Sequence, residues 1–265
     1  MENESTTSQG NANTLDMNIK ASTIKTIVGA LSSISKDGKL GFNNDGIKTA
    51  LVDPSHVAML NINIRKEAME EYNIGGDFEL ALDFDKLSAI LKLATGDEPV
   101  GIHYSSDGED TRMLIEIDNI KRRMSLLDPQ GMPDPKIPDL ELNAEAKVRA
   151  SSIMRAMRAV QSVTDNFNVI GTKDGTFNIH AEGDTDQVDL TLKKGVNEEL
   201  VDFKTTGKTK SIFSLEFTEL ILKPALADTV LVIKWGTDQP IIYKYELEDG
   251  KVKFLCLLAP RIEEE

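Results

Sequence analysis

The sequence predicts an α+β fold made by duplication, in which short helices pack on extensive antiparallel sheet. Three observations support this prediction. Two segments of the chain repeat, helical and strand-like periodicities alternate along it, and Asp-Gly pairs mark hairpins between strands. Each half is therefore expected to contain two βαβββ units, each a strand, a helix and then strands.

The repeat is clearest near the start of each half. Residues 19–24 (IKASTI) lie over residues 148–153 (VRASSI) without a gap. A second echo relates residues 82–87 (LDFDKL) to residues 215–220 (LEFTEL). One domain made twice is the economical explanation.

Helices are predicted where apolar residues recur at helical spacing after a Ser/Thr start signal. The first and third helices contain Ile24, Ile27, Val28 and Leu31, and Ile153, Met157 and Val160. A second helix should begin near Asp85, and a fourth, near Leu220, should end or kink at Pro224.

Strands with one buried face are predicted where apolar and polar residues alternate. The alternating residues are Ala58, Leu60, Ile62 and Ile64; Met113, Ile115 and Ile117; Val188, Leu190 and Leu192; and Val230, Val232 and Ile242. Hairpin turns are predicted at residues 44–46, 173–175 and 248–250.

The chain is expected to divide into four segments. Residues 1–14 read as a disordered polar tail, 15–125 as the first domain, 126–141 as a connecting loop and 142–265 as the second domain. Four prolines in the loop exclude helix and central strand. Its apolar residues predict a connector that lies on the surface with these side chains packed down: Leu127, Met132, Ile137 and Leu140.

Composition limits the function classes. The net charge of −14 argues against phosphate binding unless the 30 Lys and Arg residues gather on one surface. The lone Cys256 allows no intrachain disulfide and favours a reducing compartment. No apolar stretch is long enough to span a bilayer, and the start of the chain lacks a signal pattern.

Catalytic and metal sites are not indicated. Asp53, Ser55 and His56 are neighbours in one turn, where triad geometry is rare, and no Gly-x-Ser-x-Gly elbow exists. The three histidines have no zinc spacing. Asp184, Asp186 and Asp189 lack the glycine and glutamate of a calcium loop.

Four pieces of the chain resemble one family. Residues 52–57 (VDPSHV), the proline-rich connector, residues 173–175 (KDG) and residues 258–263 (LAPRIE) are similar to proliferating cell nuclear antigen (PCNA), the archaeal members most of all. The resemblance covers nearly everything from Leu15 to the C-terminus. It implies the DNA clamp fold, with antiparallel sheets outside and four helices lining the bore of a trimeric ring.

The resemblance also implies a function without catalysis. A sliding clamp is a polymerase processivity factor that encircles duplex DNA and slides through nonspecific phosphate contacts. The residues that match the family's bore cations are Lys25, Lys92, Arg155, Arg158 and Lys223. In this family partners insert a short peptide, with a glutamine, an aliphatic residue and paired aromatics, under the connector. The matching pocket positions are Val52, His56, Val57, Leu127, Met132, Ile137, Pro240, Leu257, Ala259 and Pro260.

Ring closure would pair a strand near residues 117–125 of one subunit with a strand near residues 184–192 of the next. The first contains Lys121, Arg122 and Arg123, and the second contains Asp184, Asp186 and Asp189. We hypothesise that these opposite charges favour head-to-tail contact. The same residues would also suit a charged face that blunts an edge strand.

The implied partners are duplex DNA, DNA polymerase, an ATP-dependent clamp loader, flap nuclease, DNA ligase and repair proteins, with no cofactor, metal or membrane. The chain would be cytoplasmic and nucleoid-associated in an archaeon, or nuclear in a eukaryote. Two alternatives remain at this point. One is a clamp-fold interaction scaffold or an obligate subunit of a heterotrimeric ring, and the other is an enzyme with an unrecognised site.

Overall fold

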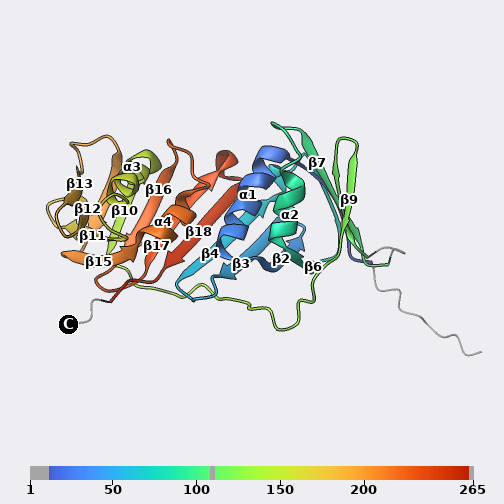
Figure 1. The fold of residues 1–265 in the computed structure, drawn as a ribbon, viewed down its shortest axis with the longest axis horizontal. Coiled ribbons are helices and arrows are strands. Elements are labelled where there is room, and N and C mark those ends of the chain that lie inside the picture. The colour runs from blue at the N-terminus through green and yellow to red at the C-terminus, as the bar shows by residue number, and fades with distance from the viewer. Residues whose placement is uncertain (1–11, 108–110, 263–265) are drawn as a thin grey trace, which may run out of the picture.

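A computed structural model of the chain describes residues 12–107 and 111–262. Figure 1 shows an elongated molecule in which the helices lie together on one face of a long sheet. The helices are α1 (Ala21–Ile34), α2 (Phe84–Leu91), α3 (Ala150–Val160) and α4 (Leu215–Leu222), with short 3-10 turns η1 (Lys66–Ala68) and η2 (Glu248–Gly250). In this part of the chain no helix is long and apolar enough to span a membrane.

The strands occur in the same order in both halves. Those of the first half are β1 (Thr14–Lys20), β2 (Asp37–Asn43), β3 (Gly46–Val52), β4 (Ala58–Arg65), β5 (Glu71–Gly75), β6 (Phe78–Asp83), β7 (Pro99–Ser105), β8 (Met113–Ile117) and β9 (Ile120–Met124). Those of the second are β10 (Ala144–Arg149), β11 (Asn166–Thr172), β12 (Thr176–Glu182), β13 (Gln187–Lys193), β14 (Leu200–Thr205), β15 (Thr209–Ser214), β16 (Val230–Trp235), β17 (Ile241–Leu247) and β18 (Val252–Leu258).

Sheet topology repeats as well. The first half forms a five-stranded sheet, β5-β1-β7-β8-β9, and a set of four strands, β4-β3-β2-β6. The second half forms β14-β10-β16-β17-β18 and the four-stranded sheet β13-β12-β11-β15. Antiparallel pairing of β18 with β4 joins the halves into one nine-stranded sheet. The predicted α+β architecture of two similar halves is confirmed, as are the hairpins at residues 44–46, 173–175 and 248–250.

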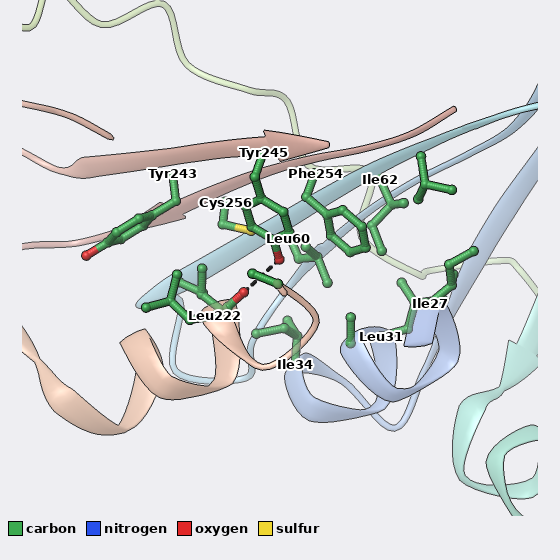
Figure 2. Close-up of a cluster of buried hydrophobic side chains, with 14 of the residues drawn as sticks. Ile27, Leu31, Ile34, Leu60, Ile62, Leu222, Tyr243, Tyr245, Phe254 and Cys256 are labelled. Atoms are coloured by element: carbon green, nitrogen blue, oxygen red, sulfur yellow. Dashed lines mark hydrogen bonds between the residues drawn. The ribbon is translucent and has the colours of Figure 1, made fainter. Parts of the chain in front are cut away.

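The junction between the halves is an apolar core (Figure 2). Ile27 and Leu31 of α1 lie near Phe254 of β18, and the Tyr245 ring stacks on Phe254 with centroids 4.8 Å apart. The buried Tyr245 hydroxyl donates to the Ile221 carbonyl at the end of α4 (2.7 Å). Burial raises the pKa of Tyr245 well above its usual value, so the hydroxyl remains a donor. Both α1 and α4 are thereby held on the same face of the sheet.

The predicted Ser/Thr start signals of the first and third helices are wrong. The helices begin at Ala21 and Ala150, directly after β1 and β10, and their N-caps, Lys20 and Arg149, make no side-chain capping bond. The first amide of each helix donates to a loop carbonyl instead: Ala21 to Glu98 and Ala150 to Thr229. Backbone carbonyls from distant loops therefore accept from the first amide of each of these helices, which have no capping hydroxyl.

Three further details differ from the predictions. On β16 the buried residues are Leu231, Ile233 and Trp235, whereas Val230 and Val232 face outward. The second repeat was predicted to align residue 82 with residue 215. Since α2 begins at Phe84 and α4 at Leu215, the equivalent residues are Phe84 and Leu215, two residues away from that alignment. The first strand begins at Thr14, inside the segment predicted as a tail, and residues 1–11 lie outside the described residues.

The turn between β3 and β4 is organised by one buried carboxylate. Asp53 accepts hydrogen bonds from the amides of Ser55 (2.8 Å), Val57 (2.7 Å) and Ala58 (2.6 Å), and from the Ser55 hydroxyl. Burial would raise its pKa, but these hydrogen bonds outweigh burial and hold the pKa below its usual value. The turn keeps His56 exposed in the left-handed region, at φ 58°. Asp53 is thus a structural acceptor for this turn.

Replacing Asp53 with Ala should lower the free energy of unfolding by about 2–4 kcal/mol, because several donors lose their acceptor. Urea denaturation at neutral pH measures the loss, and Asp139→Ala, an exposed aspartate on the connector, is the control. Since the folded pKa of Asp53 lies below its unfolded value, the carboxylate stabilises the fold fully above the unfolded pKa and ceases to do so as pH falls through the folded pKa. A stability difference that stayed constant down to the lowest pH would contradict this role.

Candidate functional site

The arginines of α3 lie on its open side. Ile153, Met157 and Val160 are buried against the sheet, whereas Arg155 and Arg158 are exposed. Since α3 packs on the sheet through its apolar face, both guanidinium groups project away from the sheet, on the face that all the helices share in Figure 1. The structure therefore places these two predicted cations on one open helix surface.

The predicted lysines lie on the other helices. Lys92 and Lys223 are exposed C-cap residues of α2 and α4. Lys25 is half-buried on α1, and its ammonium group donates to the Ala94 carbonyl just beyond α2. Within the described ranges, Lys92, Arg155, Arg158 and Lys223 have no carboxylate partner in an ion pair. These side chains are free to bind an external anion.

Two acidic residues on the same surface were missed by sequence reasoning. Glu216 and Glu219 of α4 line a hollow between α3 and α4 together with Arg158 and Lys223. The sequence did contain a signal, because Glu219 precedes Lys223 by one helical turn and therefore shares its side of the helix. The helix surface is thus positive overall but locally mixed.

Five of the residues predicted to bind partner peptides lie at one end of the strands that form the β4–β18 junction. The Ala259 amide donates to the Val57 carbonyl (2.8 Å), which fixes the C-terminal segment beside the Asp53 turn. His56 is exposed, and Pro240 and Pro260 are half-buried, at the ends of neighbouring strands. Backbone hydrogen bonds therefore bring the turn and the C-terminal segment together.

An apolar row crosses the sheet on the face opposite the helices. Cross-strand pairing aligns Val52 of β3 with Met59 of β4, then Leu257 of β18 and Ile242 of β17. Their neighbours along the strands point into the core, so this row faces the other way. Met59 and Ile242 were not predicted as site residues, because only the register of four strands puts them in line with Val52 and Leu257.

The connector runs beside this region, below the sheet in Figure 1. The Leu127 amide donates to the Ala81 carbonyl on the edge of β6 (2.9 Å), and Lys39 forms an ion pair with Asp134 (3.7 Å). Leu127, Met132 and Leu140 are half-buried, as predicted. The prediction that Ile137 packs down is wrong, because its side chain is 43% exposed.

The charged residues predicted at the subunit interface lie at two sheet edges. Lys121, Arg122 and Arg123 are on β9, the last strand of the five-stranded sheet of the first half. Asp189 is on β13, the last strand of the four-stranded sheet, and bonds His180 of β12 (3.0 Å). Asp184 and Asp186 lie in the turn before β13, which begins at Gln187 rather than near residue 184 as predicted.

Comparisons with known proteins agree with this architecture. Profiles of the PCNA N-terminal and C-terminal domains match residues 15–129 and 136–261. A DNA polymerase sliding clamp of Methanosarcina barkeri is 32% identical over 92% of this chain and 97% of the relative. One of Thermoplasma acidophilum is 30% identical over 94% of this chain and 99% of the relative.

A solved structure of A. fulgidus PCNA with the C-terminal region of FEN-1 bound has the same fold. It matches with a TM-score of 0.86 at 28% identity, covering 95% of this chain and all of that one. Together the two domain profiles span nearly the whole described chain, in the order in which its two halves occur. The chain belongs to the proliferating cell nuclear antigen family.

Proposed function

We propose that this chain is a DNA polymerase sliding clamp, a subunit of a trimeric ring that encircles duplex DNA and tethers replication and repair proteins to it. One observation supports this most strongly. In a chain with a net charge of −14, the helices that lie on one face of the sheet in Figure 1 carry four cations that have no carboxylate partner among the described residues. Its curated relatives are named DNA polymerase sliding clamps.

The chemistry suits sliding rather than sequence reading. Flexible Lys and Arg side chains attract phosphates without contacting base edges, and the attraction weakens with salt. Weak contacts of this kind exchange quickly, so the ring moves along the duplex while its closed topology retains it. The remaining acidic surface repels DNA and favours the helix-lined side. Catalysis has no part in this proposal.

The internal repeat supports a specific mode of ring closure. By order in the two halves, β9 is the counterpart of β18, and β13 is the counterpart of β4. Because β18 pairs with β4 inside the chain, the same geometry would pair β9 with β13 of the next subunit. Within the described chain both strands pair on one side only, so each offers a free edge.

The register of that pairing follows from the β18–β4 register. Transferred through the repeat, its opposed pairs include Ile120 with Leu190, Lys121 with Asp189, and Arg122 with Val188. Ile120 is 44% exposed in the single chain, and burial against Leu190 would remove it from water. Lys121 opposite Asp189 is a favourable cross-strand charge pair.

We further propose that partner peptides bind along the apolar row, the Asp53 turn and the connector. The exposed Ile137 and the half-buried Met132 and Pro240 offer apolar area for aromatic anchors. The bound FEN-1 segment of the A. fulgidus structure supports a nuclease among the partners. Polymerase, ligase and an ATP-dependent clamp loader would use the same surface.

A heterotrimeric ring or a clamp-fold scaffold is the second candidate. Either one keeps the fold but changes the partner at the β9 or β13 edge. The mass of the purified chain in solution separates a homotrimer from an obligate heterotrimer, because only the homotrimer assembles alone.

The double variant Arg155→Ala/Arg158→Ala should bind a short linear duplex about tenfold more weakly at low salt, and its affinity should depend less on salt. Fluorescence anisotropy across a salt series measures both. The control is Lys208→Ala/Lys210→Ala, which removes two exposed cations from the β15 region. Equal affinities for the two double variants would contradict a role for the helix face in DNA binding.

Lys121→Glu should shift the ring toward monomers, because it opposes two carboxylates across the joined edge. Adding Asp189→Lys should restore trimers by reversing the pair. Analytical ultracentrifugation measures the distribution, with Lys66→Glu as an exposed control far from β9. The double variant Arg122→Glu/Arg123→Glu should contain a still larger fraction of monomers than Lys121→Glu. A trimer unaffected by any of these changes would refute the proposed junction.

Ala259→Arg should weaken binding of a peptide that contains a glutamine, an aliphatic residue and paired aromatics by at least about tenfold. The long charged side chain would occupy the surface beside Val57 without altering the helix face. Calorimetry measures the affinity, and Ala227→Arg, an exposed alanine after α4, is the matched control. If Ala259→Arg bound the peptide as tightly as the control, the proposed surface would be wrong.

A further inference from the structure

Two hollows open on the helix face, one between each pair of helices. The hollow between α1 and α2, with a volume of about 260 Å³, is lined by Lys25, Val28, Ser88, Leu91 and Lys92. The hollow between α3 and α4, about 540 Å³, is lined by Met154, Met157, Arg158, Glu216, Glu219, Leu220, Leu222, Lys223 and Ala225. We call them the first and second hollow.

The two hollows occupy equivalent positions in the two halves of the chain. Counting from the first residue of each helix, every residue of the first hollow has a counterpart that lines the second: Lys25 and Met154, Val28 and Met157, Ser88 and Glu219, Leu91 and Leu222, and Lys92 and Lys223. Equivalent backbone positions therefore build both, and only the side chains distinguish them.

Their charges differ. Two ammonium groups, Lys25 and Lys92, line the first hollow beside the Ser88 hydroxyl, and none of the described residues that line it is acidic. In the second hollow Arg158 and Lys223 are offset by the carboxylates of Glu216 and Glu219, and the counterpart of Lys25 is the uncharged Met154.

The first hollow is also better prepared to hold an anion. The Lys25 ammonium group is anchored by its bond to the Ala94 carbonyl and retains two further N–H donors. Fixing this side chain in advance reduces the rotamer entropy lost on binding. A hydroxyl donor and a second ammonium group from α2 complete a set of donors suited to a phosphate oxygen.

We propose that the first hollow is the main phosphate-binding site of each subunit, and that Glu219, assisted by Glu216, prevents the second hollow from becoming an equal one. This inference rests on the proposed function, since it assumes duplex DNA along the helix face. Strong and weak phosphate sites then alternate around the ring. Fewer simultaneous phosphate contacts keep the hold on DNA weak enough for sliding.

Reciprocal exchanges between the hollows test the proposal. Glu219→Ser gives the second hollow the residue of the first, and should raise affinity for a short linear duplex about threefold to tenfold at low salt, with a steeper salt dependence. Ser88→Glu does the reverse and should weaken binding to a similar degree. Lys25→Met, which introduces the residue present at its counterpart, should also weaken binding and is the safer variant if Ser88→Glu does not fold.

Matched controls separate a local effect from net charge. Glu198→Ser and Thr206→Glu make the same charge changes on exposed loops of the second half. If Glu219→Ser bound DNA no better than Glu198→Ser, the inference would be overturned, as it would if Lys25→Met bound like the wild type. The proposed function would survive either result as long as Arg155→Ala/Arg158→Ala still weakened binding. If that variant also bound normally, DNA binding on the helix face would itself be wrong.

Discussion

Antiparallel pairing of β18 with β4 is the constraint on which the rest of the structure depends. It joins two copies of one domain into a continuous nine-stranded sheet, so that helices far apart in the sequence lie on one face. The stacked Tyr245 and Phe254 rings and the Tyr245 bond to α4 fix that junction from inside. The apolar row through Val52 and Leu257 crosses the same strands on the opposite face, so one junction positions both proposed surfaces.

Duplication also explains how a chain of this size would encode a ring. Inside the chain the halves meet through β18 and β4. The counterparts of these two strands, β9 and β13, are the free edge strands of the other two sheets. Repetition of the same strand pairing between subunits would then generate a head-to-tail contact, and a ring would close if the rotation per subunit permits it. The two halves have nevertheless diverged in charge, since Ser88 and Glu219 occupy equivalent helix positions.

Much of the fold could be predicted because its signals are local. Hairpin turns at Asp-Gly pairs, alternating strands and the end of α4 before Pro224 each depend on a few neighbouring residues. The predictions were wrong where contacts between residues distant in the sequence determine which side chains are buried or aligned. The run from Val230 to Trp235 is apolar on both faces apart from Lys234, so only pairing with β10 determines which side is buried. Likewise, Met59 joins the apolar row only through the register of β4 with its neighbours.

Topological retention is the most direct test of the account. The ring is loaded onto circular duplex DNA, the excess is removed, and the DNA is then cut once while bound protein is followed by gel filtration. A ring that encircles the duplex should stay on the circle at moderate salt and be lost rapidly after cutting, because the phosphate contacts alone are weak. Equal retention on circular and linear DNA, or loss from both at the same rate, would contradict a ring that encircles the duplex.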